Sequence, residues 1–522
     1  MTQKPKVFIR EATGLVREFG SWDAFGFQFG GITTAVGISV LFYSFNFLRG
    51  ANILISLIIL LPILIAYLIA DTQLAIAMPR SGGDYVYTGR ILHPALGLSA
   101  SWMLVFLLVL NPGFLSDLIT TGYIPGLLTA VGMSAQAAIF QDVTVRFVVD
   151  NILIAFCALI VIMPIKYYAK IQGAFIALAI VGSILIPGAL WALGHEGFVA
   201  AVNARSPVSY DAIIAKATSL GSQTYFSWTD TILAIPGMGL FLITNWPCAV
   251  GGEIRNVKKS MLVGNVGAGL IAWIIFFVTA AGYYYVLGPT FASSIAFLTV
   301  NSPADSPFGA ANLLTSVIQY VYGLSWVTFS VFFCLFAAAL ICAAQSIFLS
   351  TRHILAWAFD NVLPSKFASI SEKYGTPVFT TIAIWIVSEL VLLVILFWSS
   401  ALGIVLNAGI GVPMGYAPAL FAAMLFATKR KDIFDNSPSI VKLKVGGIPV
   451  TTICGLIGGV GFVVFVAFTA AFPQAGYPIT PWNVGFLLFI YVLGVVLYYI
   501  AKYYRAKQGL DITLAFKQLP PE

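Results

Sequence analysis

Long apolar stretches recur along the whole chain, and they decide what it can fold into. A helix of about 20 mainly apolar residues crosses the hydrocarbon core of a bilayer. Only 9% of the 522 residues are charged, whereas a soluble domain carries about 25%. Twelve stretches are long enough to span: 22–47, 51–78, 96–122, 146–164, 171–194, 232–252, 260–287, 316–349, 377–398, 401–427, 449–472 and 481–501. The sequence therefore predicts an all-α membrane protein with twelve transmembrane helices.

The basic residues predict how these helices are oriented, because cytoplasmic loops are enriched in Lys and Arg. If the N-terminus lies in the cytoplasm, 23 of the 27 Lys and Arg residues fall in cytoplasmic segments. The other four lie on or near the outer side: Arg49, Arg146, Arg205 and Lys216. We therefore expect a multi-pass protein of the cell membrane with both termini in the cytoplasm. The net charge of +7 is then explained by loops, without a nucleic-acid partner.

The sixth apolar stretch is interrupted in its middle. Leu233 to Ser260 reads LAIPGMGLFLITNWPCAVGGEIRNVKKS, with two prolines, two glycines and two polar residues among the twelve residues from Pro236 to Pro247. An interior proline removes a helical hydrogen bond, so this helix should break. A broken membrane helix exposes one half-helix N-terminus, which attracts anions, and one C-terminus, which attracts cations. An amino acid offers both charges.

The first span contains a second interruption, GGITTAVG, from Gly30 to Gly37. Breaks in helices 1 and 6 are typical of a five-plus-five inverted repeat with substrate bound between them. Helices 11 and 12 then follow the repeats. The predicted division is 1–21 cytoplasmic segment, 22–194 first repeat, 195–231 extracellular loop, 232–427 second repeat, 428–448 cytoplasmic loop, 449–501 helices 11 and 12, and 502–522 cytoplasmic tail.

Four stretches resemble permeases of the amino acid–polyamine–organocation (APC) superfamily. They are TGLVREFGSWDAFGFQFGGITTAVG, MPRSGGDYVYTGRILHPALG, GGEIRNVKKS and TRHILAWAFDNVLPSKFASISEKYGTPV. They lie within helices 1 to 10, in the order and spacing of that superfamily. The resemblance implies a secondary transporter that works by alternating access, with two bundled repeats rocking around a central site.

The resemblance also implies which residues bind the substrate. Its carboxylate would meet backbone amides at the first break, and its amine would meet carbonyls where the first halves of helices 1 and 6 end. The matching positions are Ala35, Val36 and Gly37 for the carboxylate, Ile32, Thr33, Phe241 and Leu242 for the amine, and Thr34 between the two sets. In the third span Asn111-Pro112-Gly113 predicts another break, with a simple kink at Pro112 as the alternative, and Asn111 and Leu108 are expected to line the pocket. Asn245 in the sixth span is a further candidate for substrate binding.

The coupling ion stays open. Many related permeases carry an acid where this chain has Asn245, and proton-coupled ones often carry a lysine where this chain has Ala179. The hydroxyls of a sodium site are not evident either, since Cys342 and Ala343 lie at those positions. A proton and sodium are both expected as candidates, with Asp117, Glu253 and Phe241 as coupling or gating residues.

Ionisable groups inside a membrane are costly and point to function. Asp117 lies about 7 Å beyond Pro112 at 1.5 Å per residue, and Asp71 lies in the inner half of the second span. A vestibule or structural role competes at both positions. Glu253 lies two residues before Arg255, and the two are candidates for an inner-gate ion pair, with an ordinary solvated helix end as the alternative.

The predicted function is amino acid transport, with neutral substrates favoured by the apolar pocket wall. Two alternatives remain: a permease for cationic amino acids or polyamines that uses Asp117, and a membrane amino acid sensor with the same fold. No enzyme motif, cofactor site or metal-ligand spacing is present, and the five cysteines lie inside apolar runs as packing residues. Either a monomer or a homodimer is compatible with the small-residue faces of helices 11 and 12.

Overall fold

A computed structural model describes residues 17–39, 41, 45, 48–308, 314–398, 408–472 and 481–517. Within these residues, ten helices are long and apolar enough to cross a membrane. Their main segments are α3 (Ile53–Ala77), α5 (Pro94–Leu118), α8 (Val143–Ile162), α9 (Ile165–Arg205), α15 (Ala268–Leu287), α18 (Trp326–Phe359), α19 (Val378–Phe397), α21 (Ala408–Lys429), α23 (Val450–Ala471) and α24 (Pro481–Lys507).

The predicted first and sixth spans are not among these ten helices, because both are broken into short segments. The first comprises α1 (Ser21–Ile32) and α2 (Thr34–Ser39). The sixth comprises α11 (Trp228–Leu233), α12 (Ile235–Leu242) and α13 (Trp246–Ala249). The two interruptions predicted from Gly, Pro and polar residues are therefore confirmed.

The remaining elements connect the long helices. They are α4 (Gly83–Ile91), η2 (Ile119–Tyr123), α6 (Ile124–Ala130), α7 (Ser134–Ala138), η3 (Ile139–Gln141), α10 (Tyr210–Ser219), η4 (Gly251–Glu253), α14 (Val257–Met261), η5 (Leu262–Gly267), α16 (Pro289–Asn301), η6 (Pro303–Asp305), α17 (Leu314–Tyr322), η8 (Ser365–Ala368), α22 (Lys431–Asn436), β1 (Lys444–Val445), β2 (Ile448–Pro449) and η10 (Ile512–Phe516). The strands β1 and β2 pair as one small antiparallel hairpin.

Two predicted features differ from the structure. The predicted break at Asn111-Pro112-Gly113 was wrong: α5 continues through Pro112 and runs on into η2 and α6. A proline inside a helix can be accommodated when neighbouring helices pack around it, and Pro112 is buried. The predicted span 316–349 combines the end of the separate helix α17 with α18, which starts after Gly323 at φ +57°.

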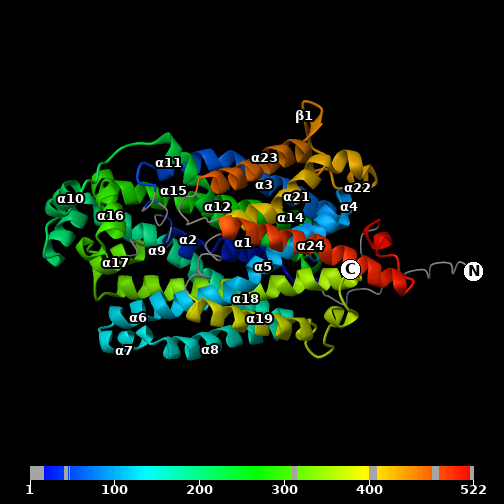
Figure 1. Cartoon of the computed structure of the whole chain (residues 1–522), viewed down its shortest axis with the longest axis horizontal. Coiled ribbons are helices and arrows are strands. Elements are labelled where there is room, and N and C mark those ends of the chain that lie inside the picture. Colours follow the sequence, from blue (N-terminus) through cyan, green and yellow to red (C-terminus); the bar gives the residue numbers. More distant parts are fainter. Residues whose placement is uncertain are drawn as a thin grey trace, which may run out of the picture.

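The long helices form an elongated bundle with distinct ends (Figure 1). The helices α6, α7, α10, α16 and α17 lie at one end, and α4 and α22 lie at the other. Arg90, predicted to be cytoplasmic, lies in α4 and Lys431 begins α22, whereas Arg205 and Lys216, predicted outside, lie at the end of α9 and in α10. These two groups of basic residues therefore lie at opposite ends of the bundle.

Burial distinguishes central from peripheral helices. Within their most apolar windows, α5 and α18 are 72% buried, whereas α24 is only 28% buried. The broken helices α1, α2 and α12 are drawn among the central elements in Figure 1, and the side chains of α2 are buried. The apolar surface that α24 leaves exposed is the surface that lipid would cover.

Glycines allow α23 to pack closely against two other helices. A Cβ atom on Gly455 would collide with the backbone of Met424 on α21, and one on Gly461 would lie 2.7 Å from Ile63 on α3. Small residues allow helix backbones in membranes to approach closely. The GLIGGVG run of α23 therefore serves close helix packing.

Candidate functional site

The break between α1 and α2 is centred on Thr33. Its backbone has φ +49° and ψ +49°, the left-handed conformation, which costs a non-glycine residue about 1–3 kcal/mol. The Thr33 amide donates to Gly30 O at 2.9 Å, and its hydroxyl lies 3.1 Å from the Cys342 sulfur. These contacts hold the chain in the turn that separates the two half-helices.

The second break follows Leu242, where α12 ends. Ile243, Thr244 and Asn245 are non-helical, and α13 begins at Trp246 with Pro247 in its first turn. Proline suits this position because the first helical amides have no intrahelical acceptor. The Ile243 amide closes α12 by donating to Gly239 O at 2.8 Å.

The two breaks lie against each other. Gln28 on α1 donates through Nε2 to Thr244 O in the second break, at 2.6 Å. A Cβ atom on Gly37 would lie 3.2 Å from the Phe241 ring, so α2 and α12 approach closely at this point. The opposed half-helix ends that the sequence predicts are thus brought together in the centre of the bundle.

The residues predicted to bind substrate at the two breaks are enclosed. Ile32, Thr33, Thr34, Ala35, Val36, Gly37 and Leu242 are buried, and Phe241 is partly buried. One predicted donor is already used: the Gly37 amide donates to Thr33 O at 2.8 Å. Within the Ala35–Gly37 segment, the amides of Ala35 and Val36 are therefore better placed to receive a carboxylate than that of Gly37.

Helix α18 links the first break to α5. Asn111 donates through Nδ2 to the Ser346 hydroxyl at 3.2 Å, and that hydroxyl donates to Cys342 O at 2.9 Å. Cys342 in turn contacts Thr33. Leu108 is buried one turn before Asn111. Sequence reasoning missed Ser346, although Cys342 and Ser346 have the i, i+4 spacing that places both on one helix face.

Asp117 forms an ion pair with Arg146. Arg146 Nη1 lies 3.0 Å from Asp117 Oδ1, and the two side chains are 22% and 19% exposed. Arg146 belongs to α8, and Asp117 lies near the end of α5. The positive charge that Asp117 was expected to attract from a substrate is therefore supplied by the protein itself.

Glu253 pairs with Arg352, not with Arg255 as expected. Arg352 Nε and Nη2 donate to the two Glu253 carboxylate oxygens at 2.8 and 2.9 Å, and both side chains are fully buried. The Arg255 side chain instead donates to Arg17 O at 2.6 Å. The prediction failed because α18 extends to Phe359 and Arg352 is buried within it. The predicted span ended at residue 349 and therefore assigned Arg352 to a loop.

The same end of the bundle is closed by backbone pairing. Phe19 N donates to Glu253 O at 3.0 Å, and Arg255 N donates to Phe19 O at 2.8 Å. Gly82 N donates to Ala249 O at 2.8 Å. The chain before α1, the chain before α4 and the chain after α13 are therefore joined beside the Glu253–Arg352 pair.

Asn245, expected to contact the substrate, is held by two carboxylates. Its Nδ2 donates to Asp71 Oδ2 at 2.7 Å and to Asp84 Oδ1 at 2.9 Å. All three side chains are buried. Asn245 is therefore fixed by α3 and α4, and its two N–H groups are already used.

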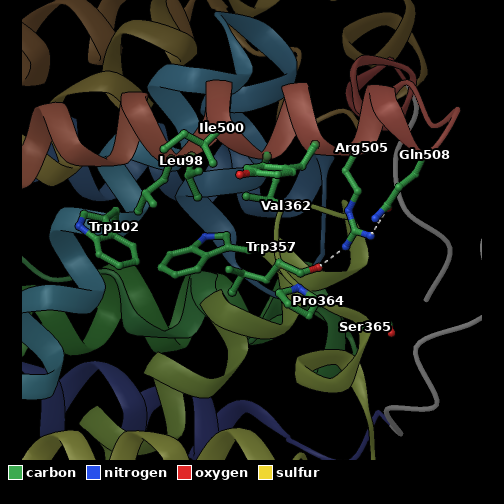
Figure 2. Close-up of a pocket in the computed structure, with 13 residues that line it drawn as sticks. Leu98, Trp102, Trp357, Val362, Pro364, Ser365, Ile500, Arg505 and Gln508 are labelled. Atoms are coloured by element: carbon green, nitrogen blue, oxygen red, sulfur yellow. Dashed lines mark hydrogen bonds between the residues drawn. The ribbon is translucent and has the colours of Figure 1, made fainter.

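A separate cavity of about 540 Å³ lies between α5, α18 and α24. Figure 2 shows Trp102 and Trp357 on one side of it and Arg505 at the other, with Arg505 bonded to Leu363 O and to Gln508. None of the predicted substrate-binding residues lines this cavity. It is therefore distinct from the region of the two breaks.

The five cysteines, Cys157, Cys248, Cys334, Cys342 and Cys454, are all buried free thiols. This arrangement agrees with their predicted packing role, and Cys342 has the additional contact with Thr33.

Comparison with known proteins agrees with this architecture. No curated protein matches the chain. A family described as amino acid permease matches residues 19–498, from the segment before α1 into the second half of α24. That range contains both broken helices and all ten long helices except for the last nine residues of α24. The chain therefore belongs to the amino acid permease family of the APC superfamily.

Proposed function

We propose that the chain is a secondary transporter for neutral amino acids that works by alternating access in the cell membrane. The observation that carries the proposal is the contact between the two breaks, where Gln28 reaches Thr244 O and Gly37 faces Phe241. Half-helix ends with opposite partial charge suit the carboxylate and ammonium of one amino acid. The family match supports an amino acid as the substrate.

In this proposal, the Ala35 and Val36 amides receive the carboxylate, and carbonyls of Ile32, Thr33, Phe241 and Leu242 receive the ammonium. Phe241 lies beside the site and closes over the bound molecule. Leu108 and Asn111 form part of the side-chain wall. Both termini lie in the cytoplasm, with the first and sixth spans included in a total of twelve.

Helix packing supports the inverted repeat. If the first repeat is α1–α2, α3, α5, α8 and α9, its counterparts are α12–α13, α15, α18, α19 and α21. Helix α5 then packs on α21 and α18 packs on α9, a pair of contacts that a two-fold relation exchanges. The contacts of α5 with α19 and of α18 with α8 are exchanged in the same way.

The Asp117–Arg146 pair favours neutral substrates over cationic ones. A carboxylate that attracts a cationic side chain should be free of a basic partner, whereas Asp117 already has one at 3.0 Å. The pocket residues at the breaks are otherwise mainly apolar or small.

The test is uptake into proteoliposomes of labelled neutral, cationic and acidic amino acids, with and without an inward proton or sodium gradient. We expect uptake or exchange of neutral amino acids above that of empty liposomes. Binding without flux or exchange under any gradient would contradict the transporter proposal and favour the amino acid sensor. Preferential uptake of arginine or polyamines would contradict the proposal of neutral substrates and favour the cationic permease.

A further inference from the structure

Two acidic side chains, Asp71 and Asp84, are buried around a single neutral amide. Asp71 lies on α3, Asp84 on α4, and Asn245 in the second break between them. Their exposed fractions are 0%, 1% and 1%. The amide has two N–H groups, and each carboxylate receives one of them.

The remaining carboxylate oxygens have no donor. Asp71 Oδ1 and Asp84 Oδ2 are buried and accept no hydrogen bond from any described residue. Within the described part of the chain, neither carboxylate forms an ion pair with Lys, Arg or His. Two like charges at one desolvated site cannot both persist without a counter-charge, so at least one must be protonated.

Among the residues that the structure describes, the titratable groups that face the pair add no positive charge. They are Tyr67 on α3, Tyr416 on α21 and Cys248 on α13, all of them buried and all subject to the charges of both carboxylates. The Tyr67 hydroxyl, one helical turn before Asp71, is fully buried and has no partner within the described residues. This hydroxyl is therefore a further buried polar atom without a hydrogen-bond partner, in addition to the two carboxylate oxygens, and it takes no part in the Asn245 bonds.

Burial also acts on Asp84, which lies outside the ten long helices. It raises the pKa of Asp84 from 3.8 to about 7, although the hydrogen bond from Asn245 opposes this rise. The group therefore exchanges a proton near neutral pH.

We propose that Asp71 and Asp84, bridged by Asn245, form a proton-binding site that couples proton movement to the second break. The inference rests on the proposed transport function for its role, but the site itself stands on the geometry. One carboxylate oxygen accepts a proton from a hydronium ion, so that an O–H bond of hydronium breaks, the carboxyl O–H bond forms and water is left. On release the carboxyl O–H bond breaks and a water molecule accepts the proton. Because Asn245 lies three residues after Leu242, the charge on this pair acts directly on the segment that ends α12.

The geometry favours a proton over a metal cation. An N–H donor already lies between the two inner oxygens, where its positive end would repel a cation. Only two carboxylate oxygens remain free, whereas hard cations such as calcium take about 6–8 oxygen ligands. Asn245 itself cannot bind a proton as a carboxylate does, but Asp71 and Asp84 place two acidic groups directly beside it.

Two measurements test the site on the full-length protein. The first is infrared spectroscopy of the purified protein, in which the C=O band of protonated buried carboxyl groups is followed from pH 5 to pH 9. We expect a component that disappears as the pH rises through about 7 and that is missing in the D71N/D84N double variant. An unchanged titration in that variant would overturn the proposal, whether or not the protein transports anything.

The second measurement compares gradient-free exchange with proton-driven accumulation in proteoliposomes. We expect D71N and D84N to keep exchange within about 3-fold of the parent and to lose accumulation above the gradient-free level. The matched control is D211N, which removes an exposed carboxylate on α10. Proton-driven accumulation that persists in the double variant, or accumulation driven by sodium that depends on Asp71, would contradict the assignment.

These outcomes separate the two proposals. If the parent protein exchanges no amino acid, the transport function fails, while the infrared titration still decides the proton site. If the double variant yields too little folded protein, the single conservative variant D84E, which keeps a carboxyl group at the site, must retain the titrating band.

Discussion

Arg352 and Glu253 form a bidentate ion pair between α18 and the end of the sixth span, and neither side chain is exposed. The Arg352 guanidinium also lies 3.5 Å from the centre of the Phe348 ring. The pair lies beside the backbone contacts that join Phe19 to Glu253 and Arg255. Opening this end of the bundle therefore requires the separation of two desolvated charges.

Removing one partner of this pair should destabilise the protein strongly. We expect E253A to lower the free energy of unfolding by about 3–5 kcal/mol, because Arg352 is left buried and unpaired. The double variant E253L/R352M should recover much of this loss, since it removes both charges. Equilibrium unfolding in detergent would measure the values, and a double variant as unstable as E253A would show that packing, not charge, is responsible.

Gly37 marks the close approach of α2 and α12. In G37V, the new side chain would meet Phe276 and Phe241, at 2.7 and 3.2 Å for its Cβ atom alone. We expect substrate binding to fall at least about 10-fold while the protein remains monodisperse. The control G188A replaces a glycine of α9 that has open space around it. Intact binding in G37V would place the substrate elsewhere.

Asp117 distinguishes the neutral substrate from the cationic one. In D117N, the Arg146 partner loses its charge pair, but the breaks are untouched. We expect uptake of neutral amino acids to change by less than about 2-fold across pH 5 to 8, in line with the small energies of partly exposed ion pairs. A selective loss of cationic substrate uptake in this variant would favour the alternative permease.

The raised pKa of Asp84 makes a prediction about stability as well as transport. Its pKa in the folded protein, about 7, is above the ordinary value of 3.8, so the folded state binds the proton more tightly. The resulting stabilisation is full below about pH 4 and is lost as the pH rises through 7. Thermal unfolding at several pH values should show a fall in Tm over this range that is smaller in D84N. Parallel curves for the two proteins would contradict this.

The broken helices were predictable because their signals are local. Glycine, proline and polar residues within one apolar run identify where backbone bonds cannot continue, and both interruptions lie where these residues do. Pro112 shows the limit of the same rule. The cluster Asn111-Pro112-Gly113 has the same composition, yet α5 continues through it, so local composition does not predict a break where the helix is well packed.

The partners of the polar residues were not predictable, because they come from distant positions. Glu253 and Arg352 are 99 residues apart, Asn245 and Asp71 are 174 apart, and Asn111 and Ser346 are 235 apart. The alternation of basic residues assigned Arg352 to a loop, since hydropathy does not reveal that the end of a helix is covered by other segments. Only the tertiary packing of distant segments brings these pairs together: Asp71 of α3 against Asn245, Arg352 of α18 against Glu253, and Asn111 of α5 against Ser346 of α18.

The glycine contacts of α23 have a mechanical consequence. Where Gly455 meets the α21 backbone and Gly461 meets Ile63 of α3, α23 places no side chain of its own between the helices. Such a contact is rigid, so α3, α21 and α23 should move together as one rigid body. The compliance of the bundle is then concentrated in the turns at Thr33 and at Ile243 to Asn245, which become its hinges.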